Sequence, residues 1–178
     1  MNDAEPFPSP APSTERADPA APSGAGLPEH LARCIADKEL DVAVVGEGAA
    51  AATAEIAARL LGVPLASIVK TMVLTDGHRY VAAIVPGDRR LDRKQVAAAL
   101  GFAKLRFASA AEVLAQTGFP AGGVAPLGFA HPTPVVVDES LSGWVIGGGG
   151  REDLLIRIAV DDIVRVHGAR RAAICQSG

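Results

Sequence analysis

Lys70 is the residue whose type and position most clearly indicate chemistry. It lies inside the apolar segment 66–75, whose side chains alternate as in a β-strand. Alternate strand residues share a face, so Lys70 points with Ile68, Met72 and Leu74 on the more apolar face. An ammonium group is rarely tolerated there without a partner anion or a water-filled pocket. The lysine therefore binds a ligand or borders a cleft, unless it only snorkels into solvent.

Two glycine-rich segments are the next candidates for a site. Residues 118–128 combine glycines, which let a ligand approach the backbone, with prolines, which stiffen it. Such a loop can present fixed N–H groups to a carbonyl or oxyanion, although a plain helix-to-strand connector has the same composition. Residues 147–150 are four consecutive glycines that match neither phosphate-binding glycine pattern. They form either a tight turn between strands or the wall of a pocket.

The sequence lacks the motifs of common hydrolases, because it contains no GxSxG, HExxH or Walker pattern. Its histidines are scattered, and Cys34 and Cys175 lie far apart without CxxC spacing. We therefore expect no metal, no cofactor and no disulfide, and a reducing, cytoplasmic compartment. Without a nucleophile–base pair, any hydrolysis would depend on positioning, oxyanion stabilisation and groups of the substrate itself.

The net charge of −3 is located in the first 26 residues, and the rest of the chain is neutral. Within that neutral part, residues 79–106 carry a local charge of +5. This basic stretch is compatible with a contact to a phosphate backbone, or it is a solvated helix face with its flanking turns. Its cations are Arg79, Arg89, Arg90, Arg93, Lys94, Lys104 and Arg106.

The length of 178 residues suits one domain with a substantial core. Residues 1–26 contain six prolines and almost no aliphatic side chain beyond alanine, so we expect a disordered leader. The folded domain is expected over residues 27–178. No apolar run approaches the roughly 20 residues that span a bilayer, so we expect no membrane partner.

Helices and strands are expected to alternate along this domain. Thr53, Asp92 and the Ser109/Glu112 capping box mark three helix starts, and Asp76-Gly77 marks a hairpin turn. Because several strands are joined by tight turns, the sheet must be mixed and largely antiparallel. The expected helices are 29–38, 53–61, 92–100, 109–118 and 161–167, and the expected strands are 41–45, 68–75, 79–85, 134–137, 143–146, 154–158 and 172–175.

Several of these segments together resemble the YbaK/prolyl-tRNA-editing domain family in its free-standing form. The resemblance rests on residues 62–64 leading into 68–74, the basic helix ending at residues 99–101, residues 117–118 leading into 122–128, and residues 135–138 with the glycine-rich turn behind them. It covers residues 30–176, and the order and spacing of the segments are more specific than any one of them. Relatives of this domain are inserted in bacterial prolyl-tRNA synthetases.

The resemblance implies a compact α/β (α+β) domain with a mixed, mostly antiparallel, partly barrel-like sheet surrounded by helices. It implies hydrolysis of the ester bond of a mischarged aminoacyl-tRNA, typically tRNA-Pro carrying a wrong small amino acid, without a metal and assisted by substrate groups. Lys70 would hold the aminoacylated 3′ end. The aminoacyl pocket would be lined by Gly122, Gly123, Val124, Ala125 and Pro126, with Gly148 and Gly149 in its wall. The acceptor stem would meet Arg89, Arg90, Arg93 and Lys94.

Two departures leave the edited amino acid open. Some relatives carry serine or threonine, and others histidine, in the turn that is all glycine here at residues 147–150. Two other functions also stay open: a catalytically inactive binding or regulatory module of the same fold, and a hydrolase of small esters or amides unrelated to tRNA. Aminoacyl-tRNA is the expected partner under the main hypothesis, with prolyl-tRNA synthetase as a second partner.

Overall fold

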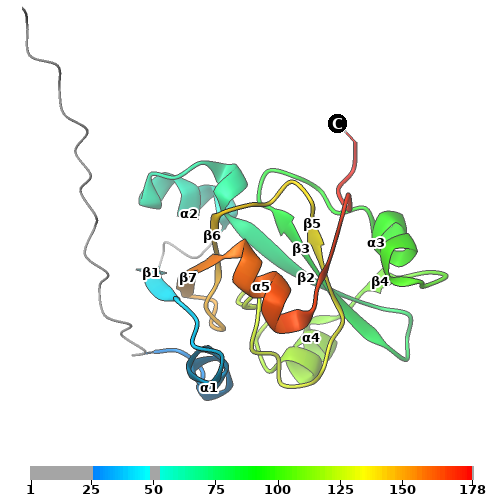
Figure 1. Ribbon diagram of the computed structural model, residues 1–178, viewed down its shortest axis with the longest axis horizontal. Coiled ribbons are helices and arrows are strands. Elements are labelled where there is room, and N and C mark those ends of the chain that lie inside the picture. Colours follow the sequence, from blue (N-terminus) through cyan, green and yellow to red (C-terminus); the bar gives the residue numbers. More distant parts are fainter. Residues whose placement is uncertain (1–25, 49–52, 178) are drawn as a thin grey trace, which may run out of the picture.

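The computed structural model describes residues 26–48 and 53–177 (Figure 1). The expected disorder of residues 1–26 therefore lies outside the described residues, apart from Gly26. The helices are α1 (Glu29–Asp37), α2 (Ala54–Leu61), α3 (Arg93–Leu100), α4 (Ala110–Thr117), α5 (Val160–His167) and a 3₁₀ turn at Leu65–Ser67. The strands are β1 (Ala43–Glu47), β2 (Val69–Thr75), β3 (Tyr80–Pro86), β4 (Arg106–Phe107), β5 (Val135–Asp138), β6 (Trp144–Gly148), β7 (Leu154–Ala159) and β8 (Arg170–Ala172).

The strands form two sheets that meet at one edge. One sheet has the order β1-β7-β6 and is antiparallel, and the other has the order β4-β2-β3-β5-β8. In the second sheet β4, β2 and β3 are antiparallel, whereas β5 and β8 join as parallel strands. A single bridge between Ile68 and Ile146 links the two sheets without closing a barrel. The expected mixed, mostly antiparallel α/β domain is therefore confirmed.

Local sequence signals account for most element boundaries. The β2–β3 hairpin turns at Asp76 and Gly77, where Gly77 has φ +102° and Asp76 accepts hydrogen bonds from the N–H groups of His78 and Arg79. Thr53 and Asp92 cap α2 and α3. Ser109 forms the predicted capping box at the start of α4. Each cap satisfies N–H groups that the first helical turn leaves free.

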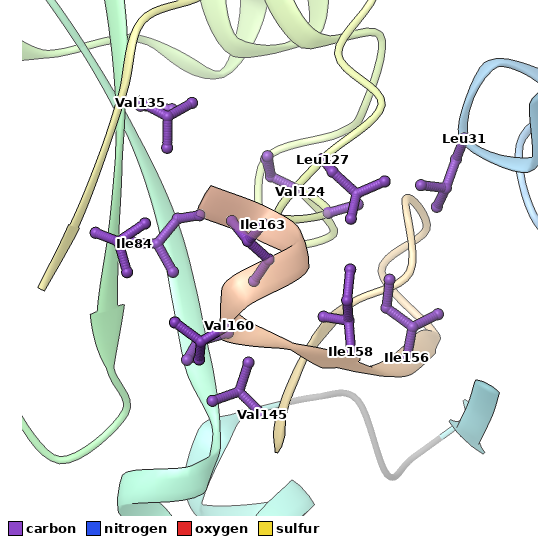
Figure 2. Close-up of a cluster of buried hydrophobic side chains, with 14 of the residues drawn as sticks. Leu31, Ile84, Val124, Leu127, Val135, Val145, Ile156, Ile158, Val160 and Ile163 are labelled. Carbon is purple, nitrogen blue, oxygen red and sulfur yellow. The ribbon is translucent and has the colours of Figure 1, made fainter. Parts of the chain in front are cut away.

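The main core lies between the two sheets and is closed by α5. Figure 2 shows Val160 and Ile163 of α5 pointing among side chains from both sheets, including Ile84 of β3 and Ile158 of β7. A smaller core lies on the other face of β2 and β3, under α3. β2 therefore has apolar neighbours on both of its faces.

Two expectations from the sequence need correction, and one strand was not expected. Gly147 and Gly148 are the last two residues of β6 and not part of a turn, because both pair with β7. The last strand is Arg170–Ala172 and not residues 172–175, because its pairing with β5 ends at Ala172. β4 was not predicted, since two residues carry no periodicity.

None of the helices in the described ranges is long and apolar enough to cross a membrane.

Candidate functional site

A small cavity of about 240 Å³ opens beside the first half of β2. β4 pairs only with Leu74 and Thr75, and the bridge to β6 involves only Ile68. Between these two contacts the outer edge of β2 has no neighbouring strand among the described residues, and the cavity lies at this gap. It is lined by Thr53, Ala54, Ala57, Ile68, Val69, Lys70, Thr71, Met72, Gly122, Val124, Gly148 and Leu155.

Lys70 supplies the charge of the cavity. The face that it shares with Leu74 changes character along the strand: Leu74 is fully buried, whereas Lys70 and Met72 are half-buried. Its Nζ donates to the carbonyl oxygen of Arg89 at 3.2 Å, and no carboxylate of the described residues lies within ion-pair distance of it. Lys70 is also the only titratable side chain among the described residues that line the cavity. The ammonium group is thus available to an anion that enters.

The N-terminus of α2 forms a second positive element of the cavity. Thr53, the N-cap, and Ala54, the first helical residue, both line it. The Thr53 hydroxyl is occupied by the cap, since it accepts a hydrogen bond from the N–H of Ile56 at 3.2 Å. The helix dipole adds a partial positive charge at this end, on the same side of the molecule as Lys70.

The loop of residues 118–128 contributes two unoccupied amides. Gly123 donates its N–H to the carbonyl oxygen of Pro120 at 3.0 Å. The N–H groups of Gly122 and Val124, in contrast, have no acceptor within the described residues, and both residues line the cavity. Pro126 has no N–H to offer. The loop can therefore present the amides of Gly122 and Val124, but not that of Gly123, to a carbonyl oxygen.

A histidine supports this loop from behind. His167 Nε2 donates to the carbonyl oxygen of Pro126 at 2.9 Å, and its ring stacks on Phe129 with centroids 5.1 Å apart. Burial lowers the pKa of His167, while the bond to Pro126 opposes this in part. The imidazole is accordingly neutral at pH 7 and acts as a fixed donor to the loop.

The glycines serve mainly to let backbone approach backbone. A Cβ on Gly148 would lie 2.7 Å from the carbonyl oxygen of Val124, and a Cβ on Gly123 would lie 2.5 Å from the carbonyl carbon of Arg151. Gly149 faces Leu154, where a Cβ would come within 2.7 Å of its Cγ. The sequence suggested that these glycines make room for a ligand; the close approach seen here is between segments of the protein.

The structure brings together four of the predicted site residues: Lys70, Gly122, Val124 and Gly148 line one cavity. It places the other predicted residues elsewhere. The residues that pack behind the cavity are Gly123, Ala125, Pro126 and Gly149. Of the basic residues, Arg89 and Arg90 line a neighbouring cavity that also contains Lys70, and Arg93 and Lys94 line a groove along α3.

Sequence reasoning missed the parts of the cavity that come from distant segments. Thr53 and Ala57 reach it from α2, and Leu155 reaches it from β7. Thr53 was recognised as a cap, but nothing in its local pattern indicated a cavity. Among residues 26–48 and 53–177, no three His, Cys, Asp or Glu side chains gather as metal ligands would.

Comparisons with known proteins identify the family. The profile of the aminoacyl-tRNA editing domain matches residues 48–166. The proline–tRNA ligase of Thermosipho africanus is 32% identical over 129 residues, which is 71% of this chain but 23% of the ligase. EbsC of Enterococcus faecalis, described as a candidate Cys-tRNA(Pro)/Cys-tRNA(Cys) deacylase, is 30% identical over 68% of this chain and 76% of its own.

The fold agrees with this match. A crystal structure described as a candidate trans-editing enzyme for prolyl-tRNA synthetase superposes with a TM-score of 0.76 at 29% identity, and the match covers 85% of this chain and 99% of the other. The chain thus corresponds to nearly the whole of that protein, whereas it spans less than a quarter of the length of the ligase. The resemblance noted in the sequence is confirmed: the chain belongs to the aminoacyl-tRNA editing domain family.

Proposed function

We propose that this protein is a deacylase that hydrolyses the ester of mischarged aminoacyl-tRNA. The observation that carries the proposal is that one small cavity is lined by Lys70 together with Gly122 and Val124, whose N–H groups have no acceptor among the described residues. The relatives support it, since a ligase for proline, a candidate Cys-tRNA deacylase and a candidate trans-editing enzyme share the domain.

The cavity offers separate places for the parts of an aminoacyl ester. The apolar side chains of Ala57, Ile68 and Leu155 would surround a small amino-acid side chain. Lys70 would face the ribose of the 3′ end and the phosphate beside it, because an ammonium group favours negative charge. The ester carbonyl would then lie between these two regions, near the 122–124 loop.

Hydrolysis would proceed by attack of water on the carbonyl carbon. The amides of Gly122 and Val124 would donate to the oxygen as it gains negative charge. The bond between the carbonyl carbon and the ribose oxygen then breaks, and the proton lost by the attacking water ends on that oxygen, leaving free amino acid and free tRNA.

The hydroxyl of Thr53 and the imidazole of His167 are already engaged within the protein. Thr71 also lines the cavity, but Lys70 is the only titratable side chain there, so no protein base stands beside the Thr71 hydroxyl among the described residues. We assign the proton relay to a neighbouring hydroxyl of the substrate's ribose, and no metal would take part.

We further propose tRNA-Pro bearing a wrong small amino acid as the substrate, the acceptor end as the part recognised, and prolyl-tRNA synthetase as a partner. The names of the relatives support the choice of tRNA, and the volume of the cavity supports a small aminoacyl group. The protein would work in the cytoplasm, where tRNA is charged.

The test is a deacylation panel with purified protein. It uses tRNA-Pro, tRNA-Cys and tRNA-Ala charged with proline, cysteine, alanine or serine, and it follows the loss of labelled amino acid with and without EDTA. We expect at least one mischarged ester to be hydrolysed well above its spontaneous rate, with correctly charged prolyl-tRNA spared and EDTA without effect. Hydrolysis of no ester refutes the proposal; tight binding of an uncleavable aminoacyl-tRNA analogue in that case would identify a binding module.

A further inference from the structure

A second cavity of about 310 Å³ adjoins the first and shares Lys70 and Met72 with it. Its other walls come from the loop after β3, from β4 and from the C-terminal segment. The residues that matter here are Arg89, Arg90, Phe107 and Gln176. Because the two cavities meet at Lys70, a molecule that fills both would pass this side chain.

Phe107 is an exposed aromatic ring on a fixed backbone. It lies on β4 opposite Leu74 of β2, and the next residue, Ala108, donates its N–H to the carbonyl oxygen of Val73 at 3.0 Å. The ring is nevertheless 44% exposed, and the guanidinium of Arg93 lies 5.5 Å from its centroid. A rigid, open aromatic surface beside a cation is the arrangement on which single-stranded nucleic acids stack their bases.

The charged residues that line this cavity are all positive, and none is in an ion pair within the described part of the chain. Lys70, Arg89 and Arg90 all line the cavity, and none of the three forms an ion pair with a described carboxylate. No acidic residue of the described chain is among the lining residues. The cavity is therefore matched to a ligand with a phosphate and a flat ring.

The C-terminal segment keeps this arrangement in place. Gln176 donates its N–H to the carbonyl oxygen of Arg90 at 2.8 Å, and Cys175 pairs with Leu91. Asp92, the cap of α3, donates its N–H to the carbonyl oxygen of Ile174 at 2.8 Å. The loop that carries Arg89 and Arg90 is thus tied down at several points, and Gln176 itself lines the cavity.

We infer that this second cavity binds the 3′-terminal nucleotide of the tRNA. The base stacks on Phe107, the adjoining phosphates meet Arg89 and Arg90, and Lys70 lies at the ribose, so that the aminoacyl group enters the first cavity. The inference rests on the proposed function for the identity of the nucleic acid, and it assigns the base-stacking role to a residue outside the catalytic cavity.

Equilibrium binding of uncharged RNA tests this without any turnover. The probe is a fluorescein-labelled acceptor-stem hairpin with a single-stranded ACCA 3′ end, compared with the same hairpin made blunt, and binding is followed by anisotropy. Stacking contributes about 1–3 kcal/mol per base, which corresponds to an affinity loss of roughly 5- to 150-fold for Phe107→Ala on the ACCA hairpin. The blunt hairpin should bind wild type and Phe107→Ala equally.

The controls separate stacking from damage to the fold. Phe107→Tyr should bind like wild type, because it keeps the ring. Trp144→Ala removes a comparable exposed ring, 47% exposed with Arg157 over it at 4.6 Å, from the other sheet and should leave binding unchanged. Arg89→Ala should make the slope of the logarithm of the binding constant against the logarithm of the salt concentration shallower by about one, as expected for the loss of one phosphate contact. Should Phe107→Ala fail to fold, Phe107→Leu replaces it, because leucine keeps an apolar side chain but has no aromatic face; the same loss on the ACCA hairpin is expected, and wild-type affinity would overturn the inference.

The two proposals fail in distinguishable ways. Equal affinity of wild type and Phe107→Ala for the ACCA hairpin, or no preference of wild type for ACCA over the blunt hairpin, overturns the inference even if the deacylation panel succeeds. If binding of the ACCA hairpin depends on Phe107 but no ester in the deacylation panel is hydrolysed, the inference is supported and the catalytic proposal is refuted.

Discussion

Gly123→Ala isolates the contribution of the loop geometry, because Gly123 does not itself line the cavity. Its φ lies outside the left-handed region, so alanine brings no backbone strain of its own. The new Cβ would instead lie 2.5 Å from the carbonyl carbon of Arg151 and 2.7 Å from the N of Glu152, whereas ordinary contact begins at 3.4 Å. All of these neighbours are backbone atoms, so one segment must move by nearly 1 Å.

Overpacking of this kind costs about 1–3 kcal/mol of unfolding free energy. At roughly 2–4 °C per kcal/mol for a protein of this size, the melting temperature should fall by several degrees. The amides of Gly122 and Val124 flank the displaced residue, and a misplacement of about 1 Å in a positioning group can cost around 100-fold in rate. We therefore expect the deacylation rate, measured well below the melting temperature, to fall by one to two orders of magnitude.

Gly147→Ala is the matched control for this experiment. Its Cβ would meet the side chain of Val69 at 3.1 Å and that of Pro126 at 3.5 Å, and side chains can yield more readily than backbone. Calorimetry and single-turnover deacylation on the two variants and wild type compare the effects. If Gly123→Ala matches wild type in both, or if Gly147→Ala is impaired as strongly, the close packing of the loop does not position the amides.

Two further predictions concern Asp138 and the neighbouring thiol of Cys175. Asp138 is 1% exposed and ties β5 to the C-terminal segment. Burial alone would raise its pKa, but hydrogen bonds from Ser140, from the N–H of Ile174 and from the Cys175 thiol outweigh this and lower it. The stability that the ionised carboxylate contributes is thus present above the unfolded pKa near 4 and is lost as the pH falls through the folded pKa. Asp138→Asn should lower the free energy of unfolding in urea at pH 7 by about 1–3 kcal/mol, and it should lose less of its stability than wild type on acidification. Equal urea midpoints of variant and wild type at pH 7 would contradict this. Burial and the neighbouring Asp138 carboxylate raise the pKa of Cys175 to about 12, so at pH 8 its thiol should react with a disulfide reagent far more slowly in the native protein than in urea, and equal rates would contradict this.

Local patterns predicted much of the fold. The capping box at Ser109 and the turn at Asp76 and Gly77 are decided by residues within four positions of one another, which is why their positions agree with the structure. Lys70 was identifiable for the same reason, since strand alternation shows a charge on an apolar face. The mixed sheet followed from the tight turns between strands.

The composition of the site depends on contacts that no local pattern describes. Gly148 meets Val124, and Gly123 meets Arg151, through backbone atoms of segments more than twenty residues apart in sequence. The sequence therefore indicated glycine-rich loops but not which amides are free. Phe107 was missed because two-residue β4 has no periodicity, although an aromatic residue directly after a basic stretch was a usable signal.

The central claim is that Lys70 acts on the 3′ end of a charged tRNA, and single-turnover deacylation of the best substrate from the panel tests it most directly. Lys70→Ala should lower the rate by about 100-fold or more, as expected when the group that holds the 3′ end in position is lost, while its melting temperature stays near that of wild type because Lys70 is half-buried and forms no ion pair with a described carboxylate. Lys38→Ala, an exposed lysine after α1, should leave the rate unchanged. A Lys70→Ala rate within twofold of wild type would contradict the account.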